Sequence, residues 1–244
     1  MNDLDTPPPP ATGPRAAPAW PYALALATLA VLAVAFGLAA RSARHTDPGN
    51  LDRHVSAWVF HHRGEWPGLT AFFRGVTHLG NPAFAAPLVA LVAVGLLALR
   101  RSGRPGIARG EAWFWLALNA SGWVLATLLK LGFRRERPPV EWRLVLVHSS
   151  SFPSIHASFS AIFFGALGGL ALRSLPALPS WLRLLILGAC LGLAVAVAAS
   201  RVWLAAHWPT DVIGGSVLGL SWVLTAWLIR SRGRRAGPPL ARTR

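Results

Sequence analysis

Long apolar runs alternate with short polar segments along this chain. Six of the runs approach the roughly 20 residues that a helix needs to cross the hydrocarbon core of a membrane. They cover residues 22–40, 82–99, 112–130, 154–172, 182–200 and 212–229. Their hydrophobicity is continuous rather than periodic, as expected of helices in an apolar surrounding. The pattern predicts an all-α fold, a bundle of six transmembrane helices.

The segments outside these runs divide the chain into three parts. Residues 1–21 are rich in Pro and Ala and are predicted to form a disordered tail. Residues 22–229 form the expected membrane domain, and residues 230–244 an expected basic tail. The first apolar run is longer than the about 7 to 15 residues of a secretory signal. We therefore interpret it as a retained helix.

Composition supports this picture. The chain has 244 residues, of which 53% are hydrophobic and only 14% are charged, and its mean hydropathy is +0.44. These values are too apolar for an ordinary soluble domain and exclude a disordered chain. A disulfide scaffold is excluded because Cys190 is the single cysteine.

The charge is strongly positive, with 24 Lys and Arg against 9 Asp and Glu and a formal net charge of +15. Most arginines lie between apolar runs, where they indicate membrane topology and contact with anionic headgroups. We therefore expect the lipid bilayer as a partner, and no nucleic acid. No oligomeric state is predicted.

Arginine also predicts the orientation. Positive charge follows the last run and separates the second from the third, so these segments and both termini are expected in the cytoplasm. The opposite loops also hold many arginines, which means that another requirement keeps positive charge outside. The arginine-rich composition favours a multi-pass protein of a bacterial plasma membrane.

The unusual polar residues occur at ends of runs that this topology places on the same outer face. Ionisable groups at such depth are costly and are usually functional. The connections between the third and fourth runs and between the fifth and sixth are expected to bring together Lys130, Arg137, Ser154, His156, Arg201, His207 and Asp211. Three cations beside two histidines predict a site for a compact multivalent anion.

Each residue type fits phosphoryl chemistry. Arg137 and Arg201 offer planar donor forks and Lys130 a point charge, which stabilise the charge of a transferring phosphoryl group. Ser154 stands where a helix begins, and free N–H groups there also favour an anion. His207 and Asp211 are four residues apart, so that the carboxylate could orient one imidazole nitrogen and leave the other to attack.

The second histidine completes a reaction scheme. His156 could act as the general acid that protonates the leaving oxygen. Two alternatives stay open at this point. His207 and Asp211 could be metal ligands, although no dense cluster of carboxylates or cysteines accompanies them. Single cations at the ends of runs could also be snorkelling side chains.

Three motifs carry a family resemblance. The runs Lys130-x6-Arg137-Pro138, Phe152-Pro153-Ser154-Ile155-His156 and Ser200-Arg201-x5-His207-x3-Asp211 resemble the signature motifs of the type 2 phosphatidic acid phosphatase family. Their order and separations fit, and the six-span frame extends the resemblance over most of the chain. One position departs from the pattern, because the family often has glycine where this chain has Ile155. We expect Ile155 to be an ordinary helical residue.

The resemblance implies a membrane enzyme that removes phosphate from lipid phosphates or diphosphates without a metal or other cofactor. It implies a phosphohistidine on His207, oriented by Asp211, with His156 as the acid. The remaining positions, Lys130, Arg137, Ser154 and Arg201, would hold the phosphate. Candidate substrates are phosphatidate, phosphatidylglycerophosphate and undecaprenyl diphosphate.

Two other functions stay open. A lipid phosphotransferase would use the same site and pass the phosphoryl group to a lipid hydroxyl. A non-enzymatic anion or lipid transporter is disfavoured, because transport sites lie near the bilayer midplane whereas these residues gather at span ends.

Overall fold

The structure is a computed structural model. It describes residues 20–45, 48–103, 107–108, 110–175 and 177–235. Six helices in this part of the chain are long and apolar enough to span a membrane. They are α1 (Trp20–Ala43), α4 (Pro82–Arg101), α5 (Glu111–Leu131), α6 (Ile155–Ser174), α7 (Ser180–Trp203) and α8 (Pro209–Arg235). The prediction of an all-helical six-span bundle is confirmed.

The ends of the helices follow from local sequence. Asn81 caps α4 by accepting a hydrogen bond from the N–H of Ala83, and Pro82 takes the first helical position. In the same way, Pro209 begins α8. Because of Pro209, α8 starts three residues before the predicted run, and Asp211 lies inside its first turn instead of preceding it.

The tails predicted from the sequence fall largely outside the described residues. For residues 1–19 and 236–244 the prediction stays untested. Within the described part, α1 already includes residues 20 and 21, and α8 continues to Arg235. The last helix is therefore longer than predicted at its basic end.

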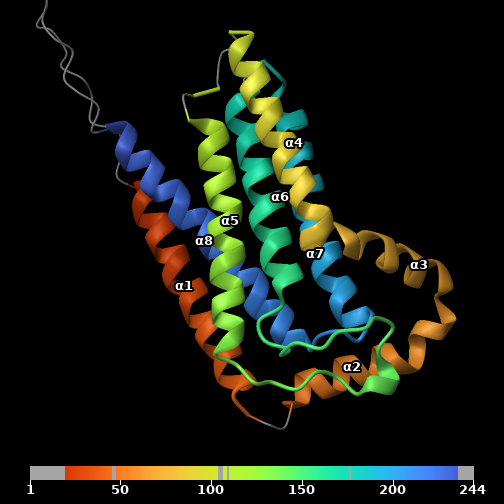
Figure 1. The fold of residues 1–244 in the computed structure, drawn as a ribbon. Coiled ribbons are helices and arrows are strands. Elements are labelled where there is room, and N and C mark those ends of the chain that lie inside the picture. The colour runs from red at the N-terminus through yellow and green to blue at the C-terminus, as the bar shows by residue number, and fades with distance from the viewer. Residues whose placement is uncertain (1–19, 46–47, 104–106, 109, 176, 236–244) are drawn as a thin grey trace, which may run out of the picture.

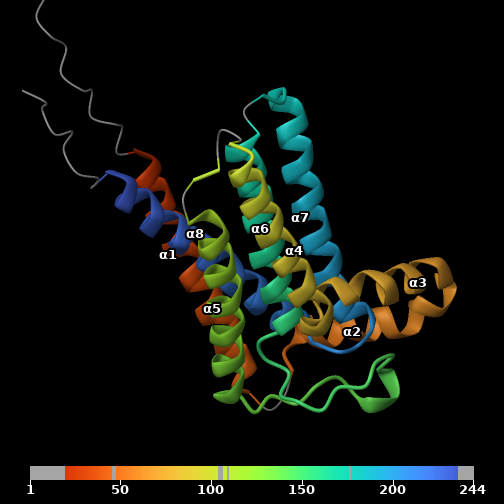
Figure 2. The ribbon, with the colours of Figure 1, turned by 45° about the horizontal axis from the view of Figure 1, so that its top comes forward.

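Helix α6 occupies the centre of the bundle. It packs against α7, α8 and α5, and Figures 1 and 2 show these helices around it. The core between α4, α5, α6 and α7 contains the buried rings of Trp115, Phe159 and Phe163. Helix α1 packs on α8 at the edge of the bundle. The outward faces of the helices carry many exposed Leu, Val and Trp side chains, as expected for contact with lipid.

An arm of two short helices leaves the bundle between α1 and α4. It consists of α2 (Asn50–His62), the 3-10 turn η1 (Arg63–Glu65), α3 (Pro67–Val76) and the 3-10 turn η2 (Thr77–Gly80). In Figure 1 the arm projects sideways from one end of the bundle. The same end holds residues 132–154, which connect α5 to α6 and include the 3-10 turn η3 (Val140–Trp142).

Candidate active site

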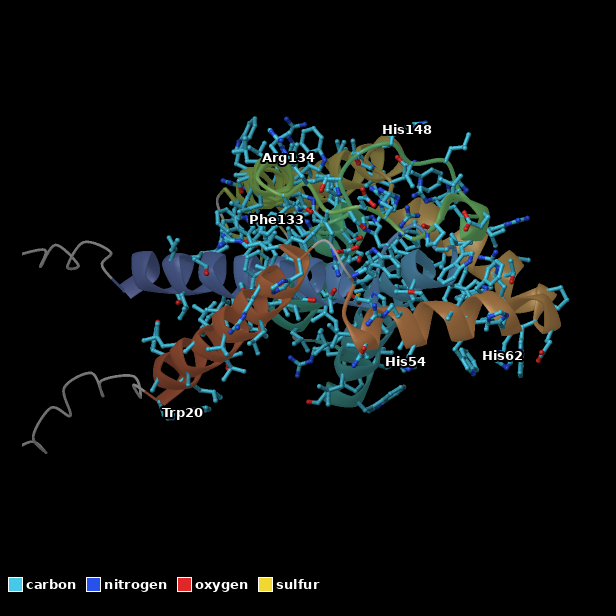
Figure 3. The ribbon with its side chains drawn as sticks, turned by 90° about the horizontal axis from the view of Figure 1, so that it is seen from below. Trp20, His54, His62, Phe133, Arg134 and His148 are labelled. Carbon is cyan, nitrogen blue, oxygen red and sulfur yellow. The ribbon has the colours of Figure 1, made fainter. Side chains whose placement is uncertain are left out.

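The end of the bundle beside the arm collects all seven residues predicted for the site. They come from the C-terminal end of α5, the connection after it, the start of α6, the last turn of α7, the segment that leads into α8 and the first turn of α8. Figure 3 looks onto this end, with the connection labelled at Arg134 and His148 on one side and α2 labelled at His54 and His62 on the other.

His207 and Asp211 face each other as the four-residue spacing predicts. The distance from Nδ1 of His207 to Oδ2 of Asp211 is 3.6 Å, and both side chains are buried. The same Oδ2 accepts hydrogen bonds from the backbone N–H of Trp208, at 2.9 Å, and from the hydroxyl of Ser151. Asp211 is thereby fixed by donors from two different segments.

The second imidazole nitrogen faces Arg137. Nη1 of Arg137 lies 3.1 Å from Nε2 of His207. A guanidinium can only donate, so Nε2 must offer its lone pair and the imidazole proton belongs on Nδ1, toward Asp211. This is the tautomer that a nucleophilic Nε2 requires.

Burial keeps this imidazole neutral. It lowers the pKa of His207 to about 3, with the positive charges of Arg137 and Lys130 acting in the same direction and Asp211 opposing them. At neutral pH Nε2 of His207 is therefore unprotonated, and its lone pair accepts from Arg137. A neutral imidazole is the form that could attack an electrophile.

Arg137 is held rigidly while keeping its charge. Nε donates to the carbonyl oxygen of Ser149 at 2.7 Å, Nη2 to that of Ser150 at 3.2 Å, and Nη1 to that of Ala206. Burial lowers the pKa of Arg137 to about 10, so the guanidinium remains protonated at neutral pH. A fixed cation beside Nε2 suits an incoming phosphate.

Lys130 and Ser154 complete the wall formed by α5 and α6. Nζ of Lys130 donates to the carbonyl oxygens of Ser151 and Pro153, at 3.3 and 3.1 Å. Ser154 is the N-cap of α6, where its hydroxyl accepts from the N–H of Ala157, and its own N–H donates to the carbonyl of Asp211 at 3.1 Å. Ile155 is the first residue of α6, an ordinary helical position as predicted.

Arg201 and His156 lie on the side of the site that faces η2. Nη1 of Arg201 donates to the hydroxyl of Thr77 at 2.7 Å, and its buried Nε has no hydrogen-bond partner among the described atoms. A side chain at Gly80 would meet His156 at 3.1 Å, so glycine allows η2 to approach the imidazole closely. The charges of Lys130, Arg137 and Arg201 all act on His156.

A comparison with protein families matches residues 111–235 of this chain to the PAP2 superfamily. This range is about half of the chain and includes all seven residues of the candidate site. The chain belongs to the PAP2 superfamily.

Two curated PAP2 relatives and one solved structure are similar to the chain. Phosphatidylglycerophosphatase B of Bacillus subtilis (strain 168) is 31% identical over 156 residues, which cover 63% of this chain and 71% of the relative. Decaprenylphosphoryl-5-phosphoribose phosphatase of Mycobacterium tuberculosis (strain ATCC 25618 / H37Rv) is 31% identical over 162 residues, which cover 63% and 76%.

The solved structure is that of a transmembrane PAP2-type phosphatidylglycerolphosphate phosphatase from Bacillus subtilis. It aligns with a TM-score of 0.74 and 26% identity over 89% of this chain and 99% of the other. Together these matches identify the protein as a membrane phosphatase of the PAP2 type that acts on lipid phosphate esters.

Four polar residues of this PAP2 site were not predicted. Arg135 donates to Oδ1 of Asp211 at 2.6 Å. Ser151, Thr77 and Asp52 bind Asp211, Arg201 and Arg135, respectively. The sequence contains a usable signal for Arg135, because residues two apart in an extended segment share a face and Arg137 is two positions away. For Asp52 and Thr77 the signal is absent, since their partners are distant in sequence.

Metal ligation was the alternative for the histidine and aspartate pair. In the part of the chain that the structure describes, no group of three or more His, Cys, Asp and Glu side chains is arranged to hold a metal ion. A reaction without metal or cofactor stays a prediction.

Proposed function

We propose that this PAP2 protein hydrolyses lipid phosphates at the outer face of a bacterial plasma membrane, through a phosphohistidine on His207. One observation carries the proposal. His207 presents Nε2 to a fixed arginine at 3.1 Å and Nδ1 to a buried carboxylate at 3.6 Å. This arrangement is that of a nucleophile with an orienting group behind it and a phosphate-binding cation in front.

In the first half of the reaction, Nε2 of His207 attacks phosphorus and the bond from phosphorus to the lipid oxygen breaks. Lys130, Arg137 and Arg201 stabilise the charge on the phosphoryl oxygens. Asp211 stabilises the positive imidazole that forms. His156 gives its proton to the leaving oxygen, and the negative charge of the bound phosphate allows His156 to hold that proton despite the surrounding cations.

In the second half, water attacks the phosphohistidine. His156, now neutral, takes a proton from this water, and the bond from Nε2 to phosphorus breaks. Inorganic phosphate leaves, His207 regains its free lone pair, and His156 is again protonated. The protons and bonds of the starting enzyme are restored.

A groove between α4 and α5 suits the lipid tail. Its volume is about 460 Å³, and its lining is mostly apolar, with Val89 from α4, Leu116 and Trp123 from α5, and Phe159 from α6. The groove begins at Pro82, two residues after the glycine that contacts His156. A tail in this groove would stay at membrane depth while its phosphate lies in the site.

The substrate class follows from these features and from the relatives. The site offers cations for one phosphate and a groove for an apolar chain. The two curated relatives are named for phosphatidylglycerophosphate and for a decaprenylphosphoryl phosphoribose. We therefore propose four candidates: these two lipids, phosphatidate and undecaprenyl diphosphate.

The experiment is phosphate release by the purified protein in mixed micelles with EDTA, with the four lipids offered in parallel. The expected result is release from at least one lipid, loss of release in His207→Ala, and full release in His148→Ala, an exposed histidine of the same end. A phosphoenzyme that survives alkali but not acid should form in the parent. Release that depends on an added divalent ion, or that persists in His207→Ala, would overturn the mechanism.

The same experiment separates the alternative that uses the same site. A labelled second lipid in place of free phosphate would show phosphoryl transfer. Transport without chemistry would instead leave the lipid phosphate intact. In proteoliposomes, the flux of lipid phosphate through His207→Ala would then equal the flux through the parent.

A further inference from the structure

A buried chain of charges connects the arm to the nucleophile. Asp52, on α2, accepts from Nη2 of Arg135 at 2.5 Å, and Nη1 of Arg135 donates to Asp211 at 2.6 Å. Asp52 lies outside the three motifs recognised in the sequence, and Arg135 stands at one of the unspecified positions between Lys130 and Arg137. Both carboxylate side chains are fully buried, and that of Arg135 is 3% exposed.

A second set of bonds joins the same elements. Oδ1 of Asp52 accepts from the backbone N–H of Thr210 at 2.9 Å, and Oδ2 accepts from its hydroxyl at 2.7 Å. The hydroxyl of Thr210 also lies 2.7 Å from Nη1 of Arg135. Since Thr210 directly precedes Asp211, α2 holds the first turn of α8 at the residue next to the orienting carboxylate.

The charge count of this group explains why two carboxylates are present. With Arg135 alone, a guanidinium would pair with Asp211 and cancel the negative charge that should act on His207. Asp52 supplies a second negative charge on the far side of Arg135, so the three groups together keep one net negative charge. Asp211 is thus fixed by a cation without being neutralised by it.

We propose that Asp52 and Arg135 are positioning residues of the phosphatase site, which hold the Asp211 carboxylate in place and keep it negative behind His207. The proposal rests on the function proposed above, because it assigns to Asp211 the task of orienting the nucleophile. Neither residue touches the reacting atoms. Their effect on the reaction passes through Asp211.

The test compares Asp52→Asn and Arg135→Lys with the parent on dioctanoyl phosphatidate in mixed micelles. In metal sites, loss of a residue that hydrogen-bonds to a ligand typically lowers activity about 10- to 100-fold, and Asp52 and Arg135 support Asp211 in a comparable way. We expect this loss in kcat, with KM changed less than about twofold, because the phosphate-binding cations are untouched. Glu111→Gln is the matched control, since Glu111 is a buried carboxylate bridging Arg173 and Arg230 at the opposite end of the bundle.

A double-mutant cycle distinguishes positioning from a general structural role. If Asp52 acts only through Asp211, then Asp52→Asn should add nothing to the loss caused by Asp211→Asn. Multiplying losses would show an independent effect and would overturn the proposal. So would a kcat of Asp52→Asn equal to that of the parent while Asp211→Asn is inactive.

The pH profile of kcat gives a readout that simple loss of structure does not move. In the folded protein His207 faces Lys130, Arg137, His156 and Asp211. Asp52→Asn makes this surrounding more positive, which disfavours protonated His207 and moves the acidic limb to lower pH. Arg135→Gln makes it more negative and should move the limb to higher pH.

Two measurements keep the outcome clear. Thr210→Val keeps the backbone bond to Asp52 and removes only the hydroxyl bonds. We therefore expect it to fold, with a smaller loss of kcat, even if Asp52→Asn does not fold. If Asp52→Asn cannot be purified, an unchanged kcat and pH profile in folded Thr210→Val would overturn the proposal. If the parent itself releases no phosphate from any of the four lipids, or if His207→Ala remains active, the proposed function fails. If the parent is active and His207→Ala inactive, the variants at positions 52 and 135 decide the positioning role alone.

Discussion

At the scale of single residues, His207 is where burial and charge act most directly on chemistry. Its pKa is lowered to about 3, whereas the pKa of a histidine in an unfolded chain is about 6.5. Between these two pH values unfolding takes up a proton. The neutral imidazole therefore contributes stability that is complete above about pH 6.5 and is lost as the pH falls toward 3.

This linkage predicts an acid-dependent loss of stability. The free energy of unfolding of the parent should fall as the pH decreases from about 6.5 to 3, with His207 contributing a slope of at most about 1.4 kcal/mol per pH unit. His207→Gln should remove that part of the slope and His148→Gln should not. Thermal unfolding in detergent at several pH values measures this slope. Equal slopes in the parent, His207→Gln and His148→Gln would contradict the lowered pKa of His207.

Residues of the motifs could be predicted from the sequence, and their supports could not. The short spacing of His207 and Asp211, with His207 two residues before α8 and Asp211 in its first turn, indicates their contact directly. Asp52 meets Arg135 only because the first turn of α2 lies beside the first turn of α8 at this end of the bundle. Such a contact depends on the path of the chain, and no local pattern contains it.

At the scale of elements, the approach of α6 to α8 sets the position of the candidate site. Gly215 lies on α8 one turn after Asp211, and a Cβ there would stand 2.4 Å from the carbonyl oxygen of Ser154. One turn further along α8, a Cβ on Gly219 would stand at the same distance from the carbonyl oxygen of Ser158. Two glycines thus allow the backbones of the two helices to touch.

Gly215→Ala should push α8 away from α6. Overpacking typically costs about 1 to 3 kcal/mol, and the displaced first turn of α8 should also lower kcat. Gly192→Ala is the matched control, because a Cβ on this glycine of α7 meets nothing within 4 Å. Thermal midpoint and phosphate release measure both effects, and a Gly215→Ala variant as stable and active as Gly192→Ala would contradict this packing.

The spans were predictable because apolar length is a sufficient signal for a membrane helix. Helix starts differ from the prediction by up to three residues, as at Pro209, and the end of α8 differs by six, at Arg235 in place of residue 229. The arm was less predictable. Its sequence mixes exposed Trp58, Trp66 and Phe72 with histidines and arginines, and only the structure shows two helices that project beside the bundle.

At the scale of the whole molecule, orientation decides which lipids the enzyme meets. The positive-inside pattern predicts that the site end faces outward. In a Cys190→Ser background, a cysteine at Leu146, which is 91% exposed at the site end, should react with an impermeant maleimide in intact spheroplasts. Ser102→Cys, which follows the C-terminal end of α4 and lies at the end of the bundle opposite the site, should react only after permeabilisation. The reverse pattern would place the site in the cytoplasm.

The pairing of the first and last spans has a consequence for how the protein is made. Tyr22 of α1 and Trp227 of α8 bring their rings to 6.2 Å, so two described helices that are far apart in the sequence pack against each other. During translation α1 enters the membrane long before its partner exists. His207 and Asp211, the proposed nucleophile and its carboxylate, lie just before α8 and in its first turn. A chain whose synthesis has not yet reached α8 therefore lacks Asp211, and the proposed catalytic pair forms only once α8 has been made.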